Sequence, residues 1–109
     1  MTDDVLASLA ALIHSRRHDS ASRSYTKELL DAGIERCAKK MGEEAVETVI
    51  AAMGPDRVAL KKEAADLLYH LLVVLEQKDV RLEEVLGELR SRFGTSGLAE
   101  KAARQAKPQ

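Results

Sequence analysis

The sequence has few of the residues that build disulfide frameworks, zinc clusters and aromatic platforms. Its single cysteine, Cys37, can form neither a disulfide nor a cysteine-based zinc cluster within one chain. A lone cysteine is typical of a reducing compartment, so we expect a cytoplasmic location. Aromatic residues make up 3% of the chain, and tryptophan is absent. Large β-sandwiches and base-stacking RNA-binding modules are usually richer in aromatics, so both classes are disfavoured.

The chain also lacks an excess of charge of one sign and a long apolar run. It has 17 basic and 18 acidic residues, whereas a non-specific nucleic-acid binder usually has a clear basic excess. Segment 1–17 is acidic at its start and does not resemble a secretory signal. The longest apolar stretch, 67–75, is interrupted by His70 and is too short to span a bilayer. We therefore expect neither nucleic acid nor a membrane as a partner.

Ala, Leu, Glu, Lys and Arg dominate what is present, and there are only two prolines. This composition is typical of an all-α protein. The chain of 109 residues fits a single domain, with about 105–109 as a disordered tail. A monomer of this size buries only about two-thirds of its unfolded surface. We therefore expect a helical bundle of four to five helices that is completed by oligomerisation.

Apolar periodicity, capping residues and helix breakers predict where the helices begin and end. We expect a first helix capped by Thr2 or Asp3 that ends near 16–17, followed by a loop over 18–24. The next helix is capped by Ser24 or Thr26 and ends at about Gly33. The remaining helices are expected at 34–53, at 57–76 after an Asp56 cap, and at 82–93 with Leu82, Val85, Leu86 and Leu89 facing inward.

Two of these expected helices carry carboxylates at matched spacing. One contains Glu43, Glu44 and Glu47, and the other contains Glu63 and Asp66. Residues at i and i+3 lie about 60° apart around a helix, on one face and one turn apart. Asp66 directly precedes the apolar stretch, so we expect it to be at least partly buried.

Solvated surface charge is the common explanation of acidic residues on a helix, but it does not suit partly buried carboxylates. Like charges one turn apart repel, and a partly buried charge is costly unless it is paired or binds a cation. Antiparallel packing of the two helices would gather four or five carboxylates. Such a cluster favours Mg²⁺ or Mn²⁺ over zinc. A Mg²⁺ site of this kind suggests hydrolysis of a phosphoanhydride, with Lys40 on the same face available to contact a phosphate.

Four segments carry motifs in a fixed order along the chain. They are Ser24-Tyr25-Thr26, Lys40-x-Gly42-Glu43-Glu44-Ala45-x-Glu47, Glu63-x-x-Asp66-Leu67-x-Tyr69-His70 and Ser96-Gly97-Leu98-x-Glu100-Lys101. The acidic motifs alone resemble the MazG-like superfamily of all-α nucleoside triphosphate pyrophosphatases. Together, the four segments resemble the phosphoribosyl-ATP pyrophosphatase family within it, from about residue 4 to residue 104.

The resemblance implies a reaction, a cofactor and roles for the acidic residues. The reaction is Mg²⁺-dependent hydrolysis of phosphoribosyl-ATP to phosphoribosyl-AMP and pyrophosphate, the second step of histidine biosynthesis. The implied metal ligands are Glu44, Glu47, Glu63 and Asp66, with Glu43 as a supporting or water-orienting catalytic acid and Lys40 on the triphosphate. The resemblance also implies a homodimer or higher homo-oligomer, and a separate phosphoribosyl-AMP cyclohydrolase that acts next.

The other candidate substrate-binding residues have a structural alternative beside the functional one. Ser24, Tyr25 and Thr26 can form a helix N-cap, and the same N–H groups can receive a phosphate. His70 can be a hydrogen-bonded core histidine or a substrate contact. Two other functions remain open at this point. One is a house-cleaning pyrophosphatase acting on free (d)NTPs, and the other is a helical dimerisation module without chemistry.

Overall fold

The computed structural model describes residues 4–18, 24–93, 101 and 104–105, and its ordered elements there are all helical. The described residues form five helices in chain order and no strand. These are α1 (Val5–Arg16), α2 (Tyr25–Ala32), α3 (Ile34–Met53), α4 (Arg57–Gln77) and α5 (Leu82–Ser91). The expected all-α class and the bundle of four to five helices are confirmed.

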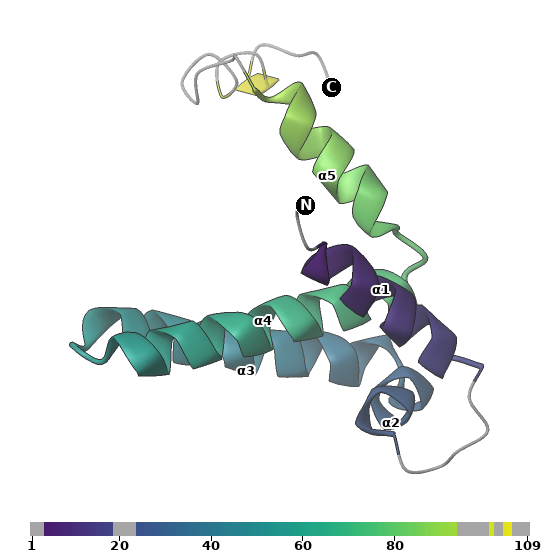
Figure 1. The fold of residues 1–109 in the computed structure, drawn as a ribbon, viewed down its shortest axis with the longest axis horizontal. Coiled ribbons are helices and arrows are strands. Elements are labelled where there is room, and N and C mark those ends of the chain that lie inside the picture. The colour runs from purple at the N-terminus through teal and green to yellow at the C-terminus, as the bar shows by residue number, and fades with distance from the viewer. Residues whose placement is uncertain (1–3, 19–23, 94–100, 102–103, 106–109) are drawn as a thin grey trace.

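The two long helices, α3 and α4, form an antiparallel hairpin (Figure 1). Gly54 and Pro55 separate them, and the Asp56 side chain caps α4 by accepting from the Val58 N–H at 2.9 Å. Gly33 separates α2 from α3 with a φ of 97°, a left-handed conformation that favours glycine. The boundaries expected at these positions are confirmed. The hairpin brings the two acid-bearing helices side by side.

The helices α1 and α2 pack across one end of this hairpin and create the core (Figure 1). Ile13, Leu29, Cys37 and Val73, which come from four different helices, are each 1% exposed. The Cys37 thiol donates to the carbonyl oxygen of Leu29 at 3.1 Å, and burial raises the pKa of this thiol. No helix in the described part of the chain has the length and apolar character of a membrane span.

The caps of the first two helices refine the sequence-based boundaries. Asp4, rather than Thr2 or Asp3, caps α1, and its Oδ1 accepts from the Ala7 N–H at 3.1 Å. Of the two predicted caps of α2, Ser24 and Thr26, the structure shows Ser24, whose side chain accepts from the Lys27 N–H at 3.3 Å. Three expected features fall wholly or largely outside the described residues. They are the loop expected at 18–24, the motif at 96–101 and the tail at about 105–109, of which only residues 18, 24, 101 and 105 are described.

The last helix, α5, extends away from the other four (Figure 1). Leu82 at its start is buried, but Leu89 is 49% exposed, so the expectation that Leu89 faces inward is wrong. The apolar spacing correctly predicts an amphipathic helix, yet none of the other described helices covers the far half of α5. The radius of gyration is 16.6 Å, against about 13 Å for a compact domain of this length.

Candidate metal site on the α3–α4 pair

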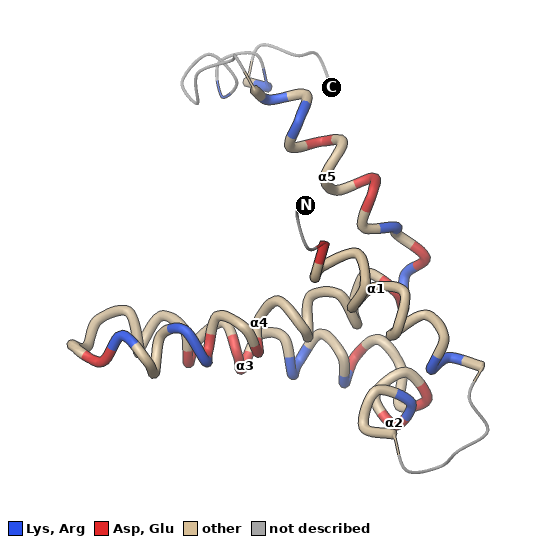
Figure 2. Tube along the Cα trace, viewed as in Figure 1, with Lys and Arg blue, Asp and Glu red and all other residues tan. Residues whose placement is uncertain are grey.

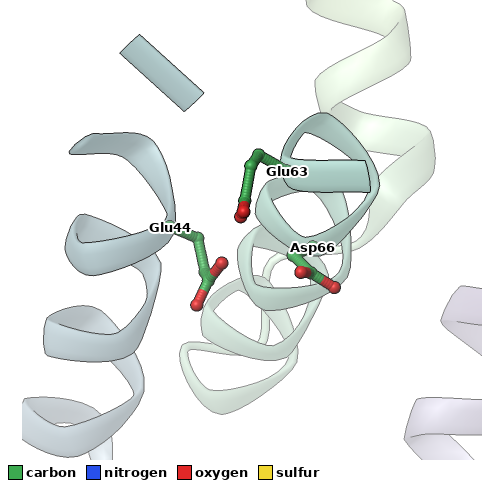
Figure 3. Close-up of side chains that lie close together, drawn as sticks. All are labelled: Glu44, Glu63 and Asp66. Atoms are coloured by element: carbon green, nitrogen blue, oxygen red, sulfur yellow. The ribbon is translucent and has the colours of Figure 1, made fainter. Parts of the chain in front are cut away.

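Three carboxylates meet between the two long helices. Glu44 comes from α3, and Glu63 and Asp66 come from α4 (Figure 3). One carboxylate oxygen from each lies within 4.8 Å of those of the other two. Figure 2 shows acidic positions of both helices near the middle of the hairpin. The antiparallel packing expected from the sequence therefore does gather the acids.

The burial of these acids differs from the expectation. Asp66 is exposed, whereas Glu44 is only 9% exposed. The prediction that Asp66 is at least partly buried is wrong, because the apolar stretch that follows it is covered only farther along α4. The hydrogen bonds that join α2 to α4 are made at Tyr69 and His70, beyond Asp66. Glu44 is buried instead, because its side chain points into the space between the paired helices (Figure 3).

Negative charge is concentrated around Glu44. Burial raises the pKa of Glu44, and the neighbouring carboxylates of Glu47 and Asp66 raise it further, while His70 acts in the opposite direction. Glu47 is not part of the close group of three, but it lies beside Glu44 one turn along α3. An extra proton or a bound cation would relieve this repulsion.

The predicted phosphate contact, Lys40, is paired with the predicted catalytic acid, Glu43. The Lys40 Nζ lies 3.3 Å from the Glu43 Oε1, and this hydrogen bond is the main cause of the raised pKa of Lys40. Both residues line an open depression on α3 together with Glu44 and Glu47. The phosphate-binding and metal-binding candidates thus share one surface.

The start of α2 is tied to α4 directly after Asp66. The His70 Nδ1 lies 2.7 Å from the Asp66 carbonyl oxygen, which can only accept, so Nδ1 carries the proton. In the neutral ring the Nε2 of His70 is then the acceptor, and the Tyr25 hydroxyl donates to it at 3.2 Å. The structure therefore brings Tyr25 and His70 to the edge of the acidic site.

A second pair of side chains joins the same two helices. The hydroxyls of Thr26 and Tyr69 form a short hydrogen bond. The rings of Tyr25 and Tyr69 stack with their centroids 6.2 Å apart, and the Tyr69 and His70 rings meet edge to face at 4.9 Å. In this arrangement Ser24 acts as the helix cap, and the hydroxyls of Tyr25 and Thr26 have intramolecular partners.

The sequence-based prediction of the site did not include two residues that the structure places there. Thr48 donates from its hydroxyl to the carbonyl oxygens of Glu44 and Glu63, and Tyr69 bonds Thr26. The signal for Thr48 is its spacing, because it lies at i+4 from Glu44 and so on the same helix face. The bond of Tyr69 depends on the docking of α2, which no local pattern encodes.

The donor set suits a hard divalent cation. Oxygen ligands from carboxylates are the ones that Mg²⁺ and Mn²⁺ prefer, and a Mg²⁺ site usually keeps some waters and binds substrate phosphates. Burial, followed by the neighbouring carboxylates of Glu47 and Asp66, raises the pKa of Glu44, so a cation bound there would stabilise its charged form. The exposed side of Asp66 leaves the group open to a substrate. The arrangement can therefore support metal-assisted attack of water on a phosphoanhydride.

Comparison with known proteins identifies close relatives. The family model described as phosphoribosyl-ATP pyrophosphohydrolase matches residues 6–93. A phosphoribosyl-ATP pyrophosphatase of Agrobacterium fabrum is 57% identical over 99 residues, which is 91% of this chain and 92% of the relative. A protein of the same name from Cereibacter sphaeroides is 54% identical over 92% of this chain and 97% of its own length. One from Azorhizobium caulinodans is 51% identical over 96% and 98%.

Proposed function

This chain belongs to the phosphoribosyl-ATP pyrophosphohydrolase family, and we propose that its reaction depends on a Mg²⁺ ion held by the α3–α4 carboxylates. The chain hydrolyses phosphoribosyl-ATP to phosphoribosyl-AMP and pyrophosphate, a step of histidine biosynthesis. The name shared by the relatives favours this substrate over free (d)NTPs. The observation that supports the metal site is the meeting of three carboxylates around the buried Glu44.

The proposed ligands are Glu44, Glu47, Glu63 and Asp66. The first two lie one turn apart on α3, and the last two lie one turn apart on α4. A bound Mg²⁺ would neutralise phosphate charge and lower the pKa of a coordinated water. The ligands themselves hold negative charge at a fixed place between two rigid helices, which suits a site that must position a triphosphate. Mn²⁺ has similar ligand preferences and is expected to substitute.

We propose that Lys40 binds a phosphate of the substrate and that Glu43 orients the attacking water. In the free protein they neutralise each other through the contact of 3.3 Å. An arriving triphosphate would compete for the Lys40 ammonium, because a phosphate carries more charge than a carboxylate. Glu43 would then be free to orient the attacking water and accept its proton.

The Ser24-Tyr25-Thr26 segment and His70 are proposed to complete the substrate side. The role of the Tyr25 hydroxyl is supported by its hydrogen bond to His70, whose ring bonds the Asp66 carbonyl oxygen. Ser24 and Thr26 fix the start of α2, where backbone N–H groups favour an anion. The bonds that these residues make in the free protein then serve to place the start of α2 beside the acids.

We propose that the working form is a homodimer or higher homo-oligomer. The outer half of the hairpin exposes several large apolar side chains, which we call the hairpin patch. Its members are Val46, Val49, Ile50, Met53 and Val58, which are 53–85% exposed. Exposed apolar surface of this extent is typical of an interface. A cytoplasmic location and a separate phosphoribosyl-AMP cyclohydrolase as the next enzyme stay predictions.

The proposed site is tested by measuring pyrophosphate release from phosphoribosyl-ATP with Mg²⁺ and with EDTA. We expect release by the wild type with Mg²⁺, none in EDTA, and little from ATP or dATP. Glu47→Gln and Asp66→Asn should each lose about 100-fold or more in kcat/KM, because each removes an anionic metal ligand. Glu88→Gln on α5, which changes an acid paired only with Arg92 among the described residues, is the matched control and should retain activity.

The outcomes test the metal requirement, the ligand residues and the substrate separately. Release that persists in EDTA would contradict the metal role. Full activity in folded Glu47→Gln and Asp66→Asn, with helicity checked by circular dichroism, would contradict the site. Faster hydrolysis of dATP than of phosphoribosyl-ATP would return the chain to the house-cleaning hypothesis.

A further inference from the structure

Thr48 links the two acid-bearing helices at the level where their carboxylates meet. Its hydroxyl Oγ1 lies 2.7 Å from the carbonyl oxygen of Glu44 in α3. The same oxygen lies 3.2 Å from the carbonyl oxygen of Glu63 in α4. Carbonyl oxygens only accept, so the single hydroxyl proton of Thr48 is shared between one acceptor in each helix. The two acceptor residues are two of the three whose carboxylates converge.

The side chain of threonine is well suited to such a link. Its β-branched carbon restricts χ1 in a helix, and the bond to the i−4 carbonyl selects the rotamer. The shorter bond to Glu44 thus fixes the hydroxyl on α3, and the longer one reaches across to α4. Thr48 is also half-buried, so water competes weakly for this proton.

We infer that Thr48 is a positioning residue that sets the spacing of α3 and α4 so that their carboxylates can share one metal ion. This inference rests on the proposed metal site. The carboxylate oxygens of Glu44, Glu63 and Asp66 lie within 4.8 Å of one another, and like charges at this distance repel. Mg²⁺ demands near-ideal ligand geometry at about 2.0–2.1 Å. A link between the backbones of Glu44 and Glu63 therefore reduces the rearrangement that metal binding requires.

The test compares Thr48→Val with the wild type. Valine has a similar shape but no hydroxyl, and both carbonyl oxygens keep their bonds within their own helices, so no buried acceptor is left unpaired. We expect the Kd for Mn²⁺, measured by calorimetry without substrate, to rise about 5- to 10-fold. The Mg²⁺ concentration for half-maximal activity should rise in parallel. At saturating Mg²⁺, the KM for phosphoribosyl-ATP should stay within about twofold of the wild type.

Two further variants separate positioning from a general loss of stability. Thr48→Ser keeps the hydroxyl and should restore the metal Kd to within about twofold of the wild type. Ser15→Ala removes a hydroxyl that bonds only the Leu12 carbonyl in its own helix among the described residues, at 2.7 Å. It should leave the metal Kd unchanged. Melting temperatures of the metal-free variants should agree within about 2 °C.

Each outcome decides the inference. The inference is overturned if Thr48→Val binds Mn²⁺ as tightly as the wild type does. It is also overturned if Thr48→Ser loses as much Mn²⁺ affinity as Thr48→Val. If Thr48→Val does not fold, Thr48→Ser carries the test by itself, and weak metal binding by that variant overturns the inference. If the wild type binds no divalent cation, the proposed metal site fails, and the role of Thr48 fails with it. Intact metal binding by the wild type, with no change in Thr48→Val, overturns the role of Thr48 alone.

Discussion

At the scale of single residues, Glu44 shows how surroundings change the chemistry of a side chain. Its sequence neighbour Glu43 is exposed and bonded to Lys40. Glu44 is buried against the carboxylates of Glu47 and Asp66, and its pKa is raised for that reason. Glu43 thus lies beside a positive charge and Glu44 beside negative charges. The proposed roles follow this difference, with Glu43 in proton transfer and Glu44 as a cation ligand.

The raised pKa of Glu44 predicts how stability depends on pH. A carboxyl with a higher pKa in the folded protein than in the unfolded one binds its proton more tightly when folded. Its stabilising contribution is fully present below its usual value of 4.5 and is lost as the pH rises through the folded pKa. We expect the free energy of unfolding of the metal-free wild type to fall relative to that of Glu44→Gln as the pH rises above 4.5.

Urea denaturation in EDTA at several pH values measures this difference. Glu88→Gln is the control, because it alters a carboxyl on the surface of α5. Saturating Mg²⁺ should remove the disadvantage of the wild type at pH 7, since a ligand bound only to the folded state stabilises it. Parallel pH profiles for the wild type and Glu44→Gln would contradict the electrostatic account.

At the scale of elements, the docking of α2 on α4 decides where the Ser24-Tyr25-Thr26 segment lies. Two hydroxyl contacts hold it, Thr26 to Tyr69 and Tyr25 to His70. The helix itself is short, spanning Tyr25–Ala32, and an isolated helix of this length is unstable in water. Its position therefore depends on these contacts and on the buried Leu29.

A double-mutant cycle on Thr26→Val and Tyr69→Phe measures the strength of this docking. Because the two hydroxyls bond each other in a half-buried place, we expect a coupling energy of about 0.5–1.5 kcal/mol from urea denaturation. Combining Tyr69→Phe with Ser91→Ala on α5 is the control and should give additive effects. A coupling near zero for Thr26 and Tyr69 would mean that their contact does not hold α2.

Element boundaries and element contacts differ in how far the sequence predicts them. The boundaries of α2, α3 and α4 at Gly33, Gly54 and Asp56 depend only on the backbone or the nearest turn of these residues. The local sequence therefore predicts them. The exposure of Asp66 and Leu89 was predicted wrongly. It depends on which helix covers each residue, and periodicity gives the apolar face of a helix but not what lies against it.

At the scale of the whole molecule, the single chain leaves apolar surface uncovered at both extremities. The hairpin patch lies at one end, and α5 with the exposed Leu89 extends from the other part of the fold (Figure 1). Exposed apolar surface of this kind is typical of protein–protein interfaces. The proposed second copy would bury such surface.

The substitution Ile50→Glu tests whether the hairpin patch joins two copies. Ile50 is 65% exposed in the single chain, and burying its side chain would contribute about 1.5–3 kcal/mol per copy. Sedimentation equilibrium should show the wild type as an oligomer and Ile50→Glu with a dissociation constant raised at least about tenfold. Leu12→Glu on α1 is the matched control, because it places the same charge at another exposed apolar residue. An unchanged oligomer in Ile50→Glu would place the interface elsewhere.

Local sequence patterns are enough to predict the helical class, the ends of the long helices and the acidic motifs at i and i+3. These features depend on interactions within one or two turns of the same helix, which a local pattern encodes. The packing of the helices on one another is what buries Glu44, lets Thr48 link the backbones of Glu44 and Glu63, and lets Tyr69 hold α2. These features arise where separate helices meet, and the distance and rotation between two helices are set by the packing of both surfaces together.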